Sequence, residues 1–144
     1  MTRSLALPAL HDETGSVAVE TAIIAPALVF LLLLVVFAGK VSEAEGNVAR
    51  AASEAARAAS LRQHPGDAAA DAERVAKENL TASGVPCIAL EVRLDISDFG
   101  PGGTVRVDLR CVASMSDVAS LGVPGQRTFS ATAVEVIDTF RSGP

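Results

Sequence analysis

Aromatic residues are scarce in this 144-residue chain, which has no Trp, no Tyr and five Phe. A surface that stacks the bases of single-stranded nucleic acid needs aromatic side chains, so such a surface is not expected. Basic residues are also few, with 12 Lys and Arg against 17 Asp and Glu, and no segment forms a basic patch. We therefore predict that the chain has no nucleic-acid partner.

The residues that carry most enzymatic and metal chemistry are scarce as well. Two Cys cannot form a four-ligand zinc site without help from His, and His11 and His64 lie far along the chain from Cys87 and Cys111. The sequence contains no nucleophile elbow, no H-E-x-x-H motif and no phosphate-binding loop. We therefore predict no enzyme activity, no metal, no cofactor and no small-molecule substrate.

Hydrophobic residues are abundant and concentrated in one run. Residues 22–39, AIIAPALVFLLLLVVFAG, contain no charged or polar side chain, and Val17, Ala18 and Val19 extend the run. A hydrocarbon core of ~30 Å needs roughly 20 helical residues, so the run is long enough to cross a lipid bilayer. A buried core helix would need a larger protein around it. A cleaved signal peptide is the other alternative. The acidic pair before the run and the helical pattern after it favour a transmembrane helix over 16–39.

The charge bias around the span gives little guidance on its orientation. Arg3 is the only Lys or Arg before it, whereas Lys40, Arg50 and Arg57 follow it. This count slightly opposes a cytoplasmic N-terminus. The cysteines and the N-terminal motif must therefore decide the orientation.

A second helical stretch follows the span directly. Residues 40–64 are rich in Ala, Glu and Arg and contain no Pro, which predicts that the membrane helix continues into water. Val48, Ala52, Ala55 and Ala59 form a narrow seam of small apolar residues at helical spacing. This seam could receive a helix of another chain, or it could pack on this chain's own sheet.

The residues after His64-Pro65-Gly66 predict a second, shorter helical segment over 65–85. Its helix is expected from about Asp67, as the N-cap, to about Ser83, and Gly84 and Pro86 end it.

Beyond Pro86 the hydrophobic period changes to two, which predicts strands. Residues 87–96 and 104–113 alternate, and the stretch 97–103 between them has the composition of a hairpin loop. A third strand is expected over 127–138, with a bulge or an end near Val134, where the alternation breaks. The predicted fold class is α+β, in which the long helix and a second helix precede an antiparallel meander of about three strands over 86–140, followed by a tail at 141–144.

Cys87 and Cys111 flank the predicted hairpin. A disulfide between them would stabilise the domain by roughly 3 kcal/mol in the chain-entropy model and would indicate an oxidising compartment. However, a register that aligns the two aliphatic faces, such as Val92 opposite Val107, puts the two cysteines on opposite faces. A kink or a bulge would be needed to join them. Two buried thiols are the alternative.

One carboxylate lies at the start of the apolar run. Glu20 has no cation near it in the sequence, and a carboxylate in hydrocarbon costs a few kcal/mol unless it is paired. If the chain were cut after Gly15, Ser16 would carry a new α-amino group that could pair with Glu20 of a neighbouring copy. Alternatively, Glu20 lies at the headgroup boundary and reaches water.

The stretch Gly15-Ser16-Val17-Ala18-Val19-Glu20 resembles a type IV prepilin processing site. Together with the apolar run and the segment ARAASEAARAAS, it is similar to TadE-like pseudopilins of tight-adherence (Flp) pilus systems. The resemblance implies a leader over 1–15, cleavage after Gly15 by a prepilin peptidase, Ser16 as the mature N-terminus and Glu20 as the assembly carboxylate. Pro26 matches the mid-span proline of the family, which would bend or loosen the helix.

We therefore predict a pseudopilin, a structural subunit of a bacterial cytoplasmic membrane with its C-terminal domain outside the cytoplasm. The resemblance implies other pilin subunits and pilus assembly platform proteins as partners, and possible incorporation into a surface pilus. The alternative is an unprocessed, membrane-anchored binding module that recruits an exported partner through its sheet edge.

Overall fold

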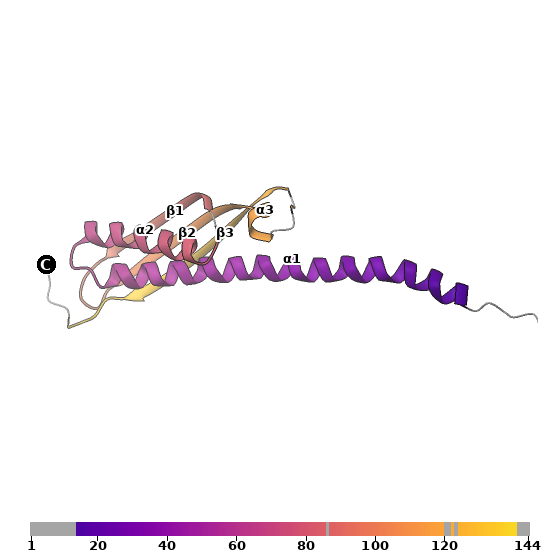
Figure 1. The fold of residues 1–144 in the computed structure, drawn as a ribbon. Coiled ribbons are helices and arrows are strands. Elements are labelled where there is room, and N and C mark those ends of the chain that lie inside the picture. The colour runs from indigo at the N-terminus through magenta and orange to yellow at the C-terminus, as the bar shows by residue number, and fades with distance from the viewer. Residues whose placement is uncertain (1–13, 86, 120–121, 123, 141–144) are drawn as a thin grey trace, which may run out of the picture. The chain divides into compact units, whose positions relative to one another are not determined.

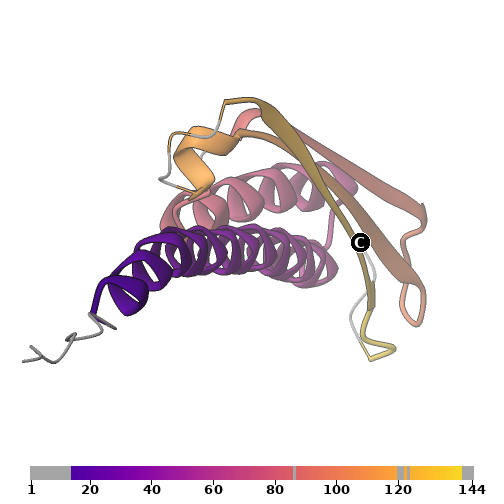
Figure 2. The same ribbon diagram turned by 90° about the vertical axis from the view of Figure 1, so that its right-hand side faces the viewer.

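The structure is a computed structural model that describes residues 14–85, 87–119, 122 and 124–140. The predicted leader up to residue 13 and the predicted tail at 141–144 lie outside the described residues. The chain divides into two compact units, Met1–Val36 and Phe37–Pro144. Figures 1 and 2 show the ribbon in two views.

Helix α1 (Thr14–Ser60) contains the whole apolar run and the Ala-rich stretch after it. Good helix formers fill the second part of α1, and no proline follows Pro26 until the helix has ended. The helix ends before His64, whose extended backbone (φ −112°, ψ 138°) is the conformation that a following proline favours.

Helix α2 (Pro65–Ala82) begins two residues earlier than expected. His64 is the N-cap residue, with no side-chain capping bond, and Asp67 lies inside the first turn. The prediction that Asp67 caps this helix is therefore wrong. Proline is tolerated at the first helical position, because the N–H that it lacks has no helical partner there. Asp67 still lies near the positive end of the helix dipole.

The strands form one antiparallel sheet in the order β1-β2-β3, with β1 at Cys87–Asp98, β2 at Thr104–Ser114 and β3 at Gln126–Val136. The connection between β2 and β3 contains a five-residue helix, α3 (Met115–Ala119), which is too short for a helical pattern in the sequence to predict. The predicted α+β fold, with a long apolar helix, a second helix and an antiparallel three-stranded meander, is confirmed.

The β1–β2 hairpin needs glycine at one position. A Cβ atom on Gly103 would lie 2.0 Å from the carbonyl oxygen of Asp98, so no other residue fits without a backbone shift. Gly102 has a φ of 81° and donates its N–H to the carbonyl of Ile137 at 3.1 Å. The loop is thereby attached to the chain that leaves β3.

A register shift in β1 places both cysteines on one face of the sheet. Val92 lies opposite Leu109, and this register alone would turn Cys87 to the opposite face from Cys111. The register shifts between Cys87 and Ala89, so that Cys87 lies opposite Ala113. The two cysteines form a disulfide with a Cα–Cα distance of 5.4 Å.

The third strand pairs with β2 without interruption from Gln126 to Val136. The predicted bulge near Val134 is therefore wrong, and the strand ends two residues beyond Val134, at Val136, instead of at Asp138. The alternation breaks in the sequence because Val134 and Val136 are aliphatic but face solvent, with 47% and 66% of their surface exposed. Small residues, Ala131 and Ala133, occupy the inward positions instead.

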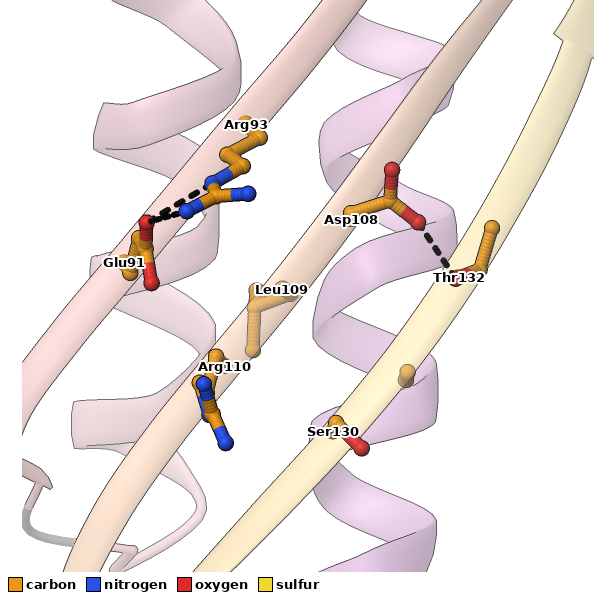
Figure 3. Close-up of a pocket in the computed structure, with 8 residues that line it drawn as sticks. Glu91, Arg93, Asp108, Leu109, Arg110, Ser130 and Thr132 are labelled. Atoms are coloured by element: carbon orange, nitrogen blue, oxygen red, sulfur yellow. Dashed lines mark hydrogen bonds and ion pairs between the residues drawn. The ribbon is translucent and has the colours of Figure 1, made fainter.

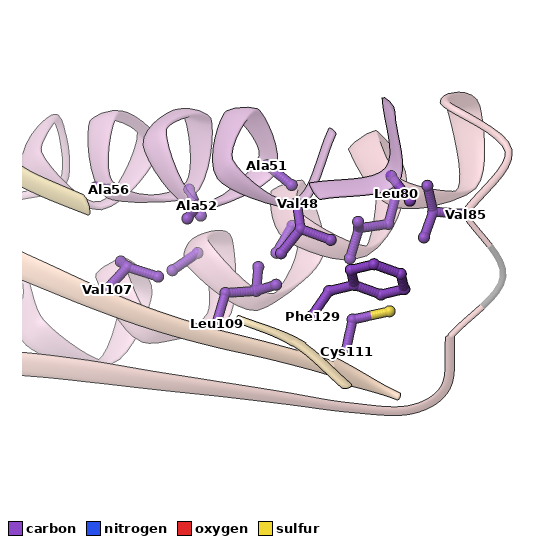
Figure 4. Close-up of a cluster of buried hydrophobic side chains, with 14 of the residues drawn as sticks. Val48, Ala51, Ala52, Ala56, Leu80, Val85, Val107, Leu109, Cys111 and Phe129 are labelled. Atoms are coloured by element: carbon purple, nitrogen blue, oxygen red, sulfur yellow. The ribbon is translucent and has the colours of Figure 1, made fainter. Parts of the chain in front are cut away.

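Helix α2 and the part of α1 that belongs to the second unit cover the same face of the sheet (Figure 2). Val48 and Ala52 of α1 belong to the same buried cluster as Leu109 and Phe129 of the sheet (Figure 4). The remaining residues of the predicted seam, Ala55 and Ala59, have no exposed surface. The seam therefore packs on the chain's own core and is closed to a partner helix.

Candidate functional site

The apolar segment of α1 is uncovered along its whole length. Every residue from Val19 to Val36 is exposed, and none of the most apolar 18-residue window, with a mean hydropathy of 2.9, is buried. No surface formed by the described residues covers these side chains. A bilayer would cover them, since a helix of this length and composition can cross one. Within the described residues this is the one candidate membrane span.

Glu20 lies at the start of this segment with its side chain exposed. Val19 and Thr21 flank it, and no Lys or Arg occurs between Arg3 and Lys40. The charge of a carboxylate in this position can be stabilised in two ways. It either reaches the polar headgroups, or it pairs with a cation that another chain supplies.

The other predicted N-terminal residues also lie on α1. The backbone of Gly15 and Ser16 belongs to its first turn, and α1 continues through Pro26. Because proline has no N–H, the carbonyl of Ala22 has no helical hydrogen-bond donor at that position. This free carbonyl can be satisfied only from outside the helix backbone, by another chain, a side chain or water.

A second row of small residues runs along the exposed face of α1 in the second unit. Its members recur every three or four residues: Gly39, Ser42, Gly46, Ala49 and Ser53. A Cβ atom on Gly39 or Gly46 would meet nothing within 4 Å, so the fold itself does not need glycine there. Glycine inside an exposed helix costs about 1 kcal/mol relative to alanine. The sequence alone does not distinguish this row from the buried seam, because both have small residues at the same helical spacing.

The outer face of the sheet carries alternating charges in matched register. Glu91, Arg93 and Asp95 of β1 lie opposite Arg110, Asp108 and Arg106 of β2, so each pair combines opposite signs. A shallow depression of about 260 Å³ lies on this face (Figure 3).

Side chains that line this depression bond to one another in two places. Arg93 Nε donates a hydrogen bond to Glu91 Oε1 at 2.7 Å, and the Thr132 hydroxyl donates a hydrogen bond to Asp108 Oδ1. No carboxylate, imidazole and nucleophile converge there among the described residues. This face therefore has the character of a solvated sheet surface.

A more apolar groove of about 530 Å³ lies between α2 and the start of β1. Leu80, Val85 and Leu90 line its floor, and Glu73 and Lys77 lie at its rim. It offers surface for contact but no arrangement of reactive groups.

A carboxylate and two arginines form ion pairs close to the turn between α1 and α2. Partial burial acts to raise the pKa of the Asp71 carboxyl, but hydrogen bonds and charges from Arg74 and Arg62 outweigh it and lower that pKa below its ordinary value. Arg74 reaches Asp71 Oδ1 at 3.1 Å, and Arg62 forms an ion pair with Asp71 Oδ2. The Arg62 contact ties the inter-helix turn to α2, and the Arg74 contact lies within α2.

No group of three or more His, Cys, Asp or Glu side chains that could hold a metal occurs in the part of the chain that the structure describes. Three features are exposed or lower stability without a reason in the fold of this chain. They are the uncovered apolar segment, Glu20 within it and the row of small residues after it. All of them lie on α1, which makes α1 the candidate functional element.

Comparison with protein families gives one result that concerns this element. Residues 15–57 match the family model described as TadE-like protein. The matched range covers the apolar segment, Glu20, Pro26 and the whole exposed row of small residues. The search of curated proteins and the search of solved structures give no match.

Proposed function

We propose that this chain, a TadE-like protein over residues 15–57, is a pseudopilin that anchors in a membrane and assembles with other pilin subunits through α1. The TadE-like family is a family of structural proteins associated with tight-adherence pili, which gives the general setting. The observation that carries the finer proposal is an uncovered apolar helix with one carboxylate, Glu20, near its start.

Processing would supply the missing cation. A prepilin peptidase that cuts after Gly15 leaves Ser16 with a free α-amino group, whose ordinary pKa of about 7.7–8.0 keeps it largely positive at neutral pH. In a bundle of parallel helices that are staggered along their axes, this amine of one subunit can lie beside Glu20 of the next. Glu20 then fixes the stagger, because any other position leaves its charge unpaired in hydrocarbon.

The exposed row on α1 fits the same assembly. Small residues let two helix backbones approach closely, whereas large side chains hold them apart. Gly46 and Ala49 lie on the face that the core leaves open, so another subunit can reach them. Pro26 lies closer to the N-terminus of α1 and leaves the Ala22 carbonyl available to a neighbouring subunit.

The disulfide supports an orientation for the anchored protein. Disulfides persist in oxidising compartments and are rare in the cytoplasm. Cys87 and Cys111 therefore favour placing the second unit outside the cytoplasm, with the N-terminus of α1 on the cytoplasmic side of a bacterial membrane. There the subunit would meet the peptidase and the pilus assembly platform proteins.

Mass spectrometry of protein extracted from native membranes tests the processing step. We expect an N-terminal peptide that begins at Ser16, and we expect Gly15→Leu to leave the chain beginning at its leader. A protein that keeps the leader throughout in wild-type membranes would refute the processing step.

A pair of matched substitutions tests the assembly step. Glu20→Ala should leave membrane insertion unchanged and abolish recovery of the chain with other pilin subunits after cross-linking. Glu54→Ala is the control, because Glu54 is also an exposed carboxylate on α1 but lies outside the apolar segment. Equal recovery of both variants would favour the alternative function, an unprocessed membrane-anchored binding module.

A further inference from the structure

Among the described residues, no strand or loop forms a backbone hydrogen-bond ladder with the outer edge of β3. Met115 donates its N–H to the Gly125 carbonyl and Ile137 donates to the Gly103 carbonyl, at 2.9 and 2.8 Å. These pairs continue the β2–β3 register, so the odd-numbered residues of β3 point their N–H and C=O groups toward β2. The even-numbered residues point theirs to the free edge: Gln126, Thr128, Ser130, Thr132, Val134 and Val136.

This edge also lacks the usual features that prevent pairing with another chain. Native edge strands are protected by bulges, prolines, lysines or frequent charges. The opposite edge, β1, has register shifts at both ends and carries Glu91, Arg93 and Asp95 on its outer face. By contrast, β3 pairs regularly from Gln126 to Val136, contains no Pro or Lys, and has charges only at Arg127 and Glu135.

The two charges of β3 are placed symmetrically about its centre. Ala131 is the middle residue of Gln126–Val136, and Arg127 and Glu135 lie equally far from it on either side. In an antiparallel pair of two β3 strands centred on Ala131, each Arg127 therefore lies opposite the Glu135 of the other copy. The same register pairs the strands over their full length and matches even-numbered residues with even-numbered residues, as the free edge requires.

We propose that β3 is a self-complementary docking surface, through which two copies of this chain join their sheets into one six-stranded antiparallel sheet. The contact is isologous, since the same residues meet on both sides of a two-fold axis at Ala131. Arg127 is already held on the inner face, where it donates to Glu45 at 2.7 Å and lies 5.5 Å from the centre of the Phe129 ring. Its guanidinium has further donors for the Glu135 carboxylate of the second copy.

The two-fold symmetry sets the relative direction of the two copies. In the second unit, α1 and β3 run in roughly the same direction along the chain (Figure 1). A two-fold axis perpendicular to the sheet reverses both, so the Phe37 ends of the two copies lie at opposite ends of the dimer. The contact is therefore distinct from the parallel packing of α1 that the proposed assembly within one membrane requires.

Register-specific cross-linking of the full chain in detergent tests the pairing directly. Directly opposed, non-hydrogen-bonded residues lie about 4.5 Å apart at Cα, within the ~4.4–6.8 Å range of a disulfide. We expect Ala131→Cys to give a disulfide-linked dimer. Ala133→Cys is the control, because the two copies of residue 133 would lie about 14 Å apart along the strands. Absence of the Ala131→Cys dimer, or equal cross-linking of both variants, would overturn the proposal.

A second pair of variants tests the backbone bonds. Ser130→Pro removes an N–H that points to the free edge and leaves the β2–β3 ladder intact, whereas Ser130→Ala keeps that N–H. Because both copies lose a central bond, we expect Ser130→Pro to weaken dimerisation in detergent by at least about tenfold and Ser130→Ala to leave it unchanged. Equal affinities of the two variants would contradict the proposed edge. Circular dichroism confirms that each variant is folded.

The two tests fail separately from the pilin proposal, because neither depends on cleavage after Gly15 or on Glu20.

Discussion

Two alanines, three residues apart on α1, give opposite predictions for the same substitution. Ala52 has no exposed surface and belongs to the buried core, whereas Ala49 is exposed and belongs to the outer row of small residues. Leucine adds the same three carbons at both positions, and its helix propensity is close to that of alanine. The two variants therefore differ only in what surrounds the added atoms.

At Ala52 the added atoms have no space, because protein interiors are close-packed. Overpacking of this kind costs about 1–3 kcal/mol. For a domain of this size the melting temperature changes by roughly 4–8 °C per kcal/mol, so we expect a decrease of about 4–24 °C for Ala52→Leu. Ala49→Leu should change the stability by less than about 0.5 kcal/mol, since it lies on an exposed surface.

The assay is urea and thermal unfolding of the purified full chain in detergent, followed by far-ultraviolet circular dichroism. Intrinsic fluorescence is not suitable, because the chain has no Trp and no Tyr. Assembly gives the complementary readout, in which Ala49→Leu should reduce recovery with other pilin subunits while the fold stays intact. If Ala52→Leu unfolds like the wild type, the predicted seam is not part of the core and the packing described above is wrong.

Three further predictions follow from the second unit. Gly46→Ala should raise stability by about 1 kcal/mol in urea unfolding, because alanine is the better helix former and a Cβ at this position meets nothing within 4 Å; an unchanged or lower midpoint would contradict this. Replacing Cys87 and Cys111 together by Ala should cost roughly 3 kcal/mol of stability and make the protein insensitive to reductant, whereas equal stability with and without reductant in the wild type would exclude the disulfide. The lowered pKa of Asp71 contributes stability that is present above the ordinary carboxyl pKa of about 3.9 and is lost as the pH falls through its lower folded-state value, so Asp71→Asn should flatten the loss of stability at acidic pH. Titration curves of the urea midpoint that coincide for the wild type and Asp71→Asn would show that this ion pair does not contribute.

Much of the local structure followed from periodicity. An unbroken apolar run predicts a membrane helix, because a bilayer requires about 20 apolar residues whatever the rest of the fold does. The alternation at 88–96 and 105–111 predicts strands for a similarly local reason, since side chains on a strand alternate between two faces. The errors came where two local signals compete, as at Pro65 and Asp67, or where aliphatic residues face solvent, as at Val134.

The candidate site was also only partly visible in the sequence. Gly15, Glu20 and Pro26 could be singled out because charge, glycine and proline are unusual beside a membrane span. The exposed row that includes Gly46 could not be separated from the buried seam that includes Ala52. Both have small residues at helical spacing, and only the position of the sheet tells which face of α1 is covered.

The sequence by itself determined the membrane-length helix, the α+β class and the residues that could carry assembly, because each depends on neighbours within a few turns or along one strand. Tertiary structure alone decided which face of α1 stays open, how the register shift brings Cys87 beside Cys111, and that β3 lies at an edge of the sheet with no backbone ladder to any other described strand. Those outcomes depend on contacts between residues far apart in the chain, and no local pattern contains the register or the packing that sets them.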